Sequence, residues 1–91
     1  MTELRTYCLV RFTRSTGRID KTMEGVGSGL LRLWALQNTP KSKDTIICEK
    51  DTGRVIWYYE GHSSGFPHIY EEDNGHIDDY CPGLHKALLE E

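Results

Sequence analysis

The segment from residue 44 to residue 60 constrains the fold more than any other part of the sequence. Two runs of β-branched and aromatic residues, at 44–50 and 54–60, flank the loop Asp51-Thr52-Gly53. A three-residue loop that ends in glycine is typical of a type I turn closed by a glycine bulge. The segment therefore predicts a β-hairpin. Its expected register places Cys48 opposite Ile56 and Ile46 opposite Tyr58 on one face, with Ile47, Val55, Trp57 and Tyr59 on the other.

A second hairpin is predicted near the N-terminus. Residues 4–13 read as a strand because apolar side chains alternate in period two. One face of this strand carries Cys8, Val10 and Phe12, and the other carries Tyr7, Leu9 and Arg11. Gly17 suits the left-handed position of the following turn, and residues 18–23 form the expected return strand.

Two helices are expected. The first spans residues 30–36 and ends at Asn38-Thr39-Pro40, because the residue before a proline is pushed out of the α region. Its predicted apolar face consists of Leu30, Leu31, Leu33, Trp34 and Leu36. The second is a short helix that starts near Pro82 and presents Leu84, Ala87 and Leu88.

These elements predict one α+β domain that spans residues 1–91. We expect a mostly antiparallel sheet of about four strands, in a ββαββ-like arrangement, packed on one central helix, with a short C-terminal helix. Residues 1–60 form the sheet-and-helix body, residues 61–80 an acidic loop region, and residues 81–91 the C-terminal helix. A chain of 91 residues has room for one modest core.

Composition and the N-terminal sequence predict a cytoplasmic location. No apolar h-region follows Met1, and the apolar cluster at residues 30–36 is too short to cross a bilayer. The three cysteines, Cys8, Cys48 and Cys81, are odd in number and widely spaced, which indicates reduced thiols rather than a disulfide framework.

Charge is distributed unevenly along the chain. Residues 1–60 contain 10 Lys and Arg against 7 Asp and Glu, whereas residues 61–91 contain 1 against 7, so +3 and −6 sum to the net charge of −3. Such an asymmetry is typical either of an acidic contact surface or of a merely solvated segment. We expect a non-catalytic protein that engages a basic partner protein. The expected contact residues are Tyr70, Glu71, Glu72, Asp73, His76, Asp78 and Asp79.

In size and charge alone, the chain is similar to small acidic proteins of phages and mobile elements that inhibit host defence nucleases, including anti-CRISPR proteins. Clustered carboxylates in such inhibitors cover a basic groove that otherwise holds nucleic acid. This resemblance implies a nucleic-acid-binding protein as the partner. It rests on no sequence motif.

An alternative is a nucleotide or single-stranded nucleic-acid binding module. Arg11 and Arg18 would hold phosphates, while Trp57 and Tyr59 would stack on bases. The acidic net charge argues against it, because nucleic-acid modules are normally basic.

Catalytic and metal signatures are incomplete in the sequence. An EF-hand reading of residues 70–81 fails because Tyr70 and Cys81 stand where ligating carboxylates are required. Cys81 and His85, with His76 or His62, do not make up the two close ligand pairs typical of a zinc site. No motif marks a nucleophile with an oxyanion donor. We therefore expect no enzyme activity, no cofactor and no metal.

Overall fold

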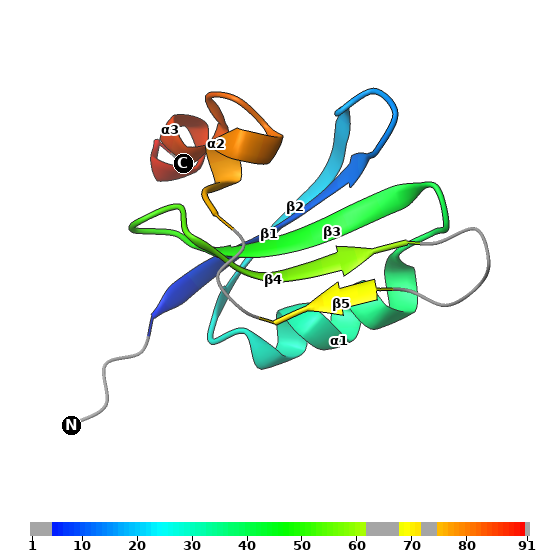
Figure 1. The fold of residues 1–91 in the computed structure, drawn as a ribbon. Coiled ribbons are helices and arrows are strands. Elements are labelled where there is room, and N and C mark those ends of the chain that lie inside the picture. Colours follow the sequence, from blue (N-terminus) through cyan, green and yellow to red (C-terminus); the bar gives the residue numbers. More distant parts are fainter. Residues whose placement is uncertain (1–4, 62–67, 72–74, 91) are drawn as a thin grey trace.

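A computed structural model describes residues 5–61, 68–71 and 75–90. The elements within these residues are β1 (Thr6–Thr13), β2 (Ile19–Val26), α1 (Gly29–Asn38), β3 (Lys43–Glu49), β4 (Val55–Glu60), β5 (His68–Tyr70), α2 (Ile77–Tyr80) and α3 (Leu84–Leu89). The strands form an antiparallel sheet in the order β2-β1-β3-β4-β5 (Figure 1). The chain is thus an α+β protein, as predicted.

Helices cover both faces of the sheet (Figure 1). On the α1 face the buried residues are Leu9, Leu31, Ala35, Ile47, Trp57 and Tyr59. On the α2–α3 face they are Cys8, Val10, Phe12, Ile46, Cys48, Val55, Ile77, Cys81 and Leu88. The expected four-strand sheet on one central helix is therefore matched only in part, because the C-terminal segment builds a second core.

The N-terminal hairpin follows its predicted pattern. Cys8, Val10 and Phe12 point to the α2–α3 face, and Leu9 points to the α1 face. Gly17 adopts a positive φ of 71° in the turn, where residues with a Cβ are disfavoured. The return strand β2 extends to Val26, three residues further than expected.

The β3–β4 hairpin is confirmed, but half of its predicted register is wrong. Ile46 lies opposite Tyr58, as expected, whereas Cys48 lies opposite Val55 instead of Ile56. The pairing shifts between Ile47 and Cys48, and such a shift turns the side chains that follow it to the other face. Val55 therefore joins the α2–α3 core, while Ile56 packs on the α1 side.

Helix α1 ends before Thr39-Pro40 as predicted, but it buries a different face. Leu31 and Ala35 are buried against the sheet, four residues apart and so on the same side of the helix. Leu30, Leu33 and Leu36 are 82%, 51% and 50% exposed. The predicted apolar face was too broad, because a surface helix buries a stripe of about 100° and not its whole circumference.

Two parts of the segment at residues 61–80 form regular structure where a loop was expected. Its residues 68–70 form β5, which pairs with β4, and its residues 77–80 form α2. Both elements are too short for their periodicity to be read from sequence. The final helix α3 begins at Leu84, two residues after Pro82, and buries Leu88, whereas Ala87 is exposed.

The C-terminal helices are fixed to the tip of the β3–β4 hairpin. The Ile77 amide donates to the Gly53 carbonyl at 2.7 Å. The His85 Nε2 donates to the Lys50 carbonyl at 2.9 Å, because a carbonyl oxygen can only accept. Gly53 has a φ of 76°, and a Cβ at this position would lie 2.4 Å from His76 Nε2. In the described part of the chain, no helix is long and apolar enough to span a membrane.

Candidate functional site

The edge of the sheet at β5 assembles polar and aromatic side chains on the α2–α3 face. Pairing of β4 with β5 places Tyr70 opposite Tyr58 and His68 opposite Glu60. Pairing of β3 with β4 places Asp44 opposite Glu60. Residues that pair directly across an antiparallel ladder share a face. Because Tyr58 packs on the α2–α3 core, this part of the face carries all five side chains.

Asp44 is the buried charge at the base of this region, with an exposed fraction of 1%. Arg14 donates to it from Nη2 at 2.6 Å and from Nε at 3.1 Å, and the Tyr58 hydroxyl donates to it at 2.6 Å. Arg14 also donates to the Gly61 carbonyl. A buried carboxylate is tolerated when its charge is paired and its oxygens accept hydrogen bonds. These donors therefore explain how Asp44 is accommodated.

Asp44 raises the pKa values of both side chains that donate to it, Arg14 and Tyr58. The hydrogen bond to Asp44, and then its negative charge, raise the pKa of Arg14 above its ordinary value. Burial, the hydrogen bond to Asp44 and the nearby charges of Asp44 and Glu60 raise the pKa of Tyr58. Tyr58 therefore remains a neutral phenol at any physiological pH.

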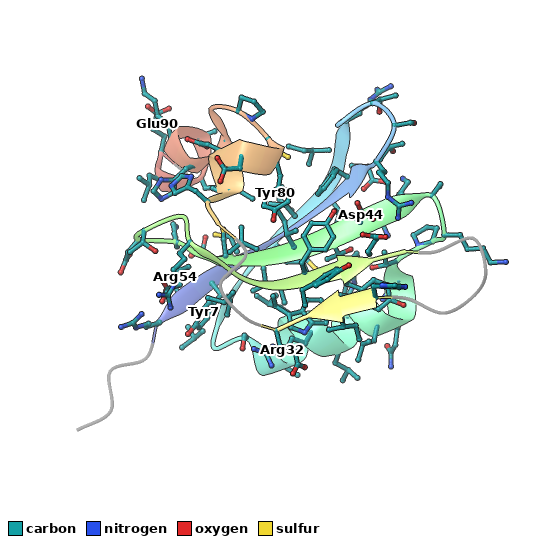
Figure 2. All side chains as sticks on the ribbon, viewed as in Figure 1. Tyr7, Arg32, Asp44, Arg54, Tyr80 and Glu90 are labelled. Atoms are coloured by element: carbon teal, nitrogen blue, oxygen red, sulfur yellow. The ribbon has the colours of Figure 1, made fainter. Side chains whose placement is uncertain are left out.

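An open hollow of about 240 Å³ lies next to the hydrogen-bonded Tyr58 and Asp44. Its lining residues are Tyr58, Glu60, Tyr70 and Tyr80. The Tyr58 ring lies 5.9 Å from the Tyr70 ring at 76°, and 5.3 Å from the Tyr80 ring at 45°, centroid to centroid. Tyr80 extends from the end of α2 toward the sheet face that carries Asp44 (Figure 2). Burial and then the charge of Asp79 raise the pKa of Tyr80. The hollow therefore combines three tyrosine rings with one carboxylate.

Those of the predicted contact residues that the structure describes lie on β5, directly after it, and at the start of α2, whose Tyr80 lines the hollow. Tyr70 lines the hollow and is 44% exposed, and Glu71 follows it on the surface. Asp79 is exposed and Asp78 is half-buried. Glu72 and Asp73 lie outside the described residues.

His76, Asp78 and Asp79 also build the turn that positions α2. The His76 side chain accepts from the Asp78 amide at 3.0 Å, and Asp79 Oδ2 accepts from the His76 amide at 3.1 Å. This reciprocal arrangement is a capping box, which satisfies donors that a helix start leaves unpaired. Asp78 Oδ1 also accepts from the His85 amide at 3.0 Å. Both carboxylates thus have hydrogen-bond partners, and Asp78 Oδ2 also lies 3.9 Å from His76 Nδ1.

Four carboxylates of the body, in contrast, are paired with basic side chains. The pairs are Arg5–Glu49, Arg11–Asp20, Arg14–Asp44, Lys43–Asp20, Lys50–Glu24 and Arg54–Glu49. Across residues 5–61, 68–71 and 75–90, neither Glu71, Asp78 nor Asp79 lies within 4.0 Å of a lysine or arginine nitrogen. The basic side chains of the N-terminal hairpin are therefore not paired with these three described carboxylates.

The residues of the nucleotide-binding alternative are not brought together. Trp57 and Tyr59 are 2% and 8% exposed beneath α1, so in this conformation a base cannot stack on them. Arg11 lies over the Trp34 ring at 5.2 Å and bonds to Asp20. Arg18 is exposed beyond the end of β1, in the first hairpin.

The three cysteines are buried core residues, and His76 and His85 contact the tip of the β3–β4 hairpin. Cys81 is 6% exposed in the α2–α3 core, and burial together with the charge of Asp78 raises its pKa. The His76 and His85 rings meet edge to face at 5.1 Å. Among the described residues, no three His, Cys, Asp or Glu side chains form a group that could hold a metal ion. Asn74 and His62, which entered the calcium and zinc interpretations, lie outside those residues.

Comparison with protein-family models, with curated proteins and with solved structures finds no match for this chain.

Proposed function

We propose that this chain is a non-catalytic binding protein that engages a basic surface on a partner protein. The contact face consists of the hollow at β4, β5 and α2 together with the carboxylates beside it. The residues are Tyr70, Glu71, His76, Asp78 and Asp79, and Glu72 and Asp73 are added from their position in the sequence.

The observation that carries the proposal is the distribution of ion pairs. Six basic side chains of the body pair with Asp20, Glu24, Asp44 and Glu49. Among the described residues, Glu71, Asp78 and Asp79 have no lysine or arginine partner within 4.0 Å. An uncompensated charge of this kind produces a field that steers an oppositely charged protein and contributes to docking specificity.

The partner class that fits this surface is a protein with a basic groove for nucleic acid. Such a groove carries clustered lysines and arginines that neutralise phosphates. The similarity in size and charge to phage inhibitors of host defence nucleases supports the same class. A protein bound in this way would compete with nucleic acid for the groove.

Isosteric neutralisation tests the proposal. Glu71→Gln, Glu72→Gln, Asp73→Asn, Asp78→Asn and Asp79→Asn are combined, because asparagine retains the oxygen that accepts the capping bonds. Basic proteins captured by the wild-type chain should be lost with this variant and displaced by DNA, and their capture should weaken as salt rises from 0.05 to about 0.5 M. The control Glu24→Gln with Asp51→Asn removes two carboxylates elsewhere and should keep binding. Unchanged capture and unchanged salt dependence in the fivefold variant would falsify the proposal.

A further inference from the structure

We propose that the hollow lined by Tyr58, Glu60, Tyr70 and Tyr80 is a binding site for an alkylammonium group, the end of a lysine side chain on the partner protein. This inference rests on the proposed function, because the lysine is supplied by the partner's basic surface. It adds a defined pocket and a defined ligand chemistry to a contact that charge alone would leave unspecific.

The walls of the hollow have the chemistry that attracts a cation. Tyr58, Tyr70 and Tyr80 come from β4, β5 and α2, so three separate elements converge on one space. The face of a tyrosine ring carries negative charge density, and an ammonium within about 6 Å of the ring centre is attracted to it. Sites that recognise alkylated ammonium groups are built from several such rings.

The charge around the hollow is negative. Glu60 lines it directly, and Asp44 lies beneath Tyr58, while Arg14 is the basic side chain bonded there. Among the described residues, two carboxylates stand here against the one guanidinium of Arg14, with His68 opposite Glu60 on β5. The charge of Asp79 acts on Tyr80. An ammonium group that enters the hollow would therefore exchange its contacts with water for contacts with the tyrosine ring faces and a carboxylate.

Size and shape favour a single side-chain end group. The volume of about 240 Å³ is below the roughly 300–1,000 Å³ of pockets that enclose drug-sized ligands. The Tyr70 and Tyr80 rings are inclined at 76° and 45° to Tyr58, so the walls do not form a parallel slot. A planar guanidinium stacks best on a flat face, whereas a compact ammonium fits converging walls.

Three small probes test the site on the full chain: Nα-acetyl-lysine amide, the arginine analogue, and the norleucine analogue that lacks the ammonium. With ¹³C-labelled tyrosine, the ring signals of Tyr58, Tyr70 and Tyr80 should shift in a saturable manner with a Kd in the millimolar range. The ring of Tyr7, on the α1 face, serves as an internal control and should not move. We expect the norleucine analogue to bind at least tenfold more weakly. Equal binding of norleucine, tighter binding of arginine, or no saturable shift would overturn the assignment.

Variants separate a binding role from a structural one. Tyr70→Leu at the exposed edge strand and Glu60→Gln should each weaken lysine binding by about three- to tenfold, which is the scale of one cation–π or carboxylate contact. Glu24→Gln on β2, at the opposite edge of the sheet, should bind as the wild type does. Circular dichroism of each variant establishes that it is folded. Folded variants of Tyr70 and Glu60 that keep wild-type affinity would contradict the assignment.

Failure of this inference can be told apart from failure of the proposed function. One outcome is that Tyr70→Leu and Glu60→Gln still capture basic proteins in a salt-dependent way, while the tyrosine signals of the wild type do not shift with the lysine probe. That outcome would support the acidic contact face and contradict the ammonium site. If the lysine probe shifts the rings but no basic protein depends on the five carboxylates, the site exists without the proposed partner.

Discussion

The Tyr58 hydroxyl donates to Asp44 at 2.6 Å, across two neighbouring strands, and both residues lie beneath the tyrosine-lined hollow. This bond holds the ring of Tyr58 in the position where it contacts the rings of Tyr70 and Tyr80. It also relieves a carboxylate that is almost completely buried. The hydrogen bond between Tyr58 and Asp44 therefore contributes both to the geometry of the hollow and to the stability of the fold around it.

Tyr58→Phe should lower the free energy of unfolding by about 1–3 kcal/mol, because a buried acceptor loses a donor. Urea unfolding measures the loss. Tyr7→Phe, at a half-buried position on the α1 face, is the matched control and should change stability by less than about 0.5 kcal/mol. Equal effects of the two substitutions would mean that the Tyr58 bond contributes nothing.

Gly53→Ala should destabilise the chain more than Gly17→Ala does. Both glycines have a positive φ, of 76° and 71°, so both substitutions carry a conformational cost of about 1–2 kcal/mol. Only at Gly53 would the new Cβ meet His76, whereas Gly17 has open space around it. We expect an additional loss of at least about 1 kcal/mol at Gly53. The addition of His76→Ala should recover part of that difference.

Glu49 makes stability depend on acid pH. Burial alone would raise its pKa, but hydrogen bonds from Thr52 and Arg5 and the charge of Arg54 lower it below its ordinary value. A carboxyl group with a depressed folded-state pKa stabilises the fold above its unfolded pKa of about 4.3, and loses this contribution as pH falls through the folded value. The stability difference between wild type and Glu49→Gln should be largest at neutral pH and shrink below pH 4.3. A constant difference from pH 7 to pH 3 would contradict this.

The three thiols should be unreactive in the folded protein. Cys8, Cys48 and Cys81 are all buried. The hydrogen bond with Cys8, and then burial, raise the pKa of Cys48, and burial raises that of Cys81. Because the thiolate is the reactive form, labelling with a thiol reagent at pH 8 should be slow in buffer and rapid in urea. Fast labelling of the native chain would contradict this prediction.

Two leucines of α1 should differ sharply in their contribution to stability. Leu31→Ala removes a side chain that is 3% exposed against the sheet and should cost about 2–4 kcal/mol. Leu33→Ala, at 51% exposure, should cost less than about 0.5 kcal/mol. A similar cost for both would mean that α1 packs as the sequence pattern first indicated.

The body of the fold could be predicted from sequence because its signals are local. The Asp51-Thr52-Gly53 turn and the alternation around Val10 identify both hairpins. The face that α1 buries could not be read, because its leucines surround the helix. The register error at Cys48 has a similar origin, since a pairing shift inside a ladder leaves no mark in composition.

The tyrosine-lined hollow could be predicted only in small part. The sequence predicts Tyr70 as part of the acidic segment, but it does not connect Tyr58, Glu60 or Tyr80 with that segment. They meet because the three-residue strand β5 adds to the edge of β4 and because α2 folds back over the sheet. Both events depend on long-range pairing, which short segments do not encode in periodicity.

Mapping the binding site of an octalysine peptide by backbone amide chemical shifts tests the central claim most directly. We predict that the perturbed amides cluster at Tyr70, Glu71, Asp78 and Asp79, and that the shifts vanish at high salt. Perturbations centred on Asp20, Glu24 or Asp51, with the β5 and α2 amides unmoved, would contradict the claim that this face receives a basic partner.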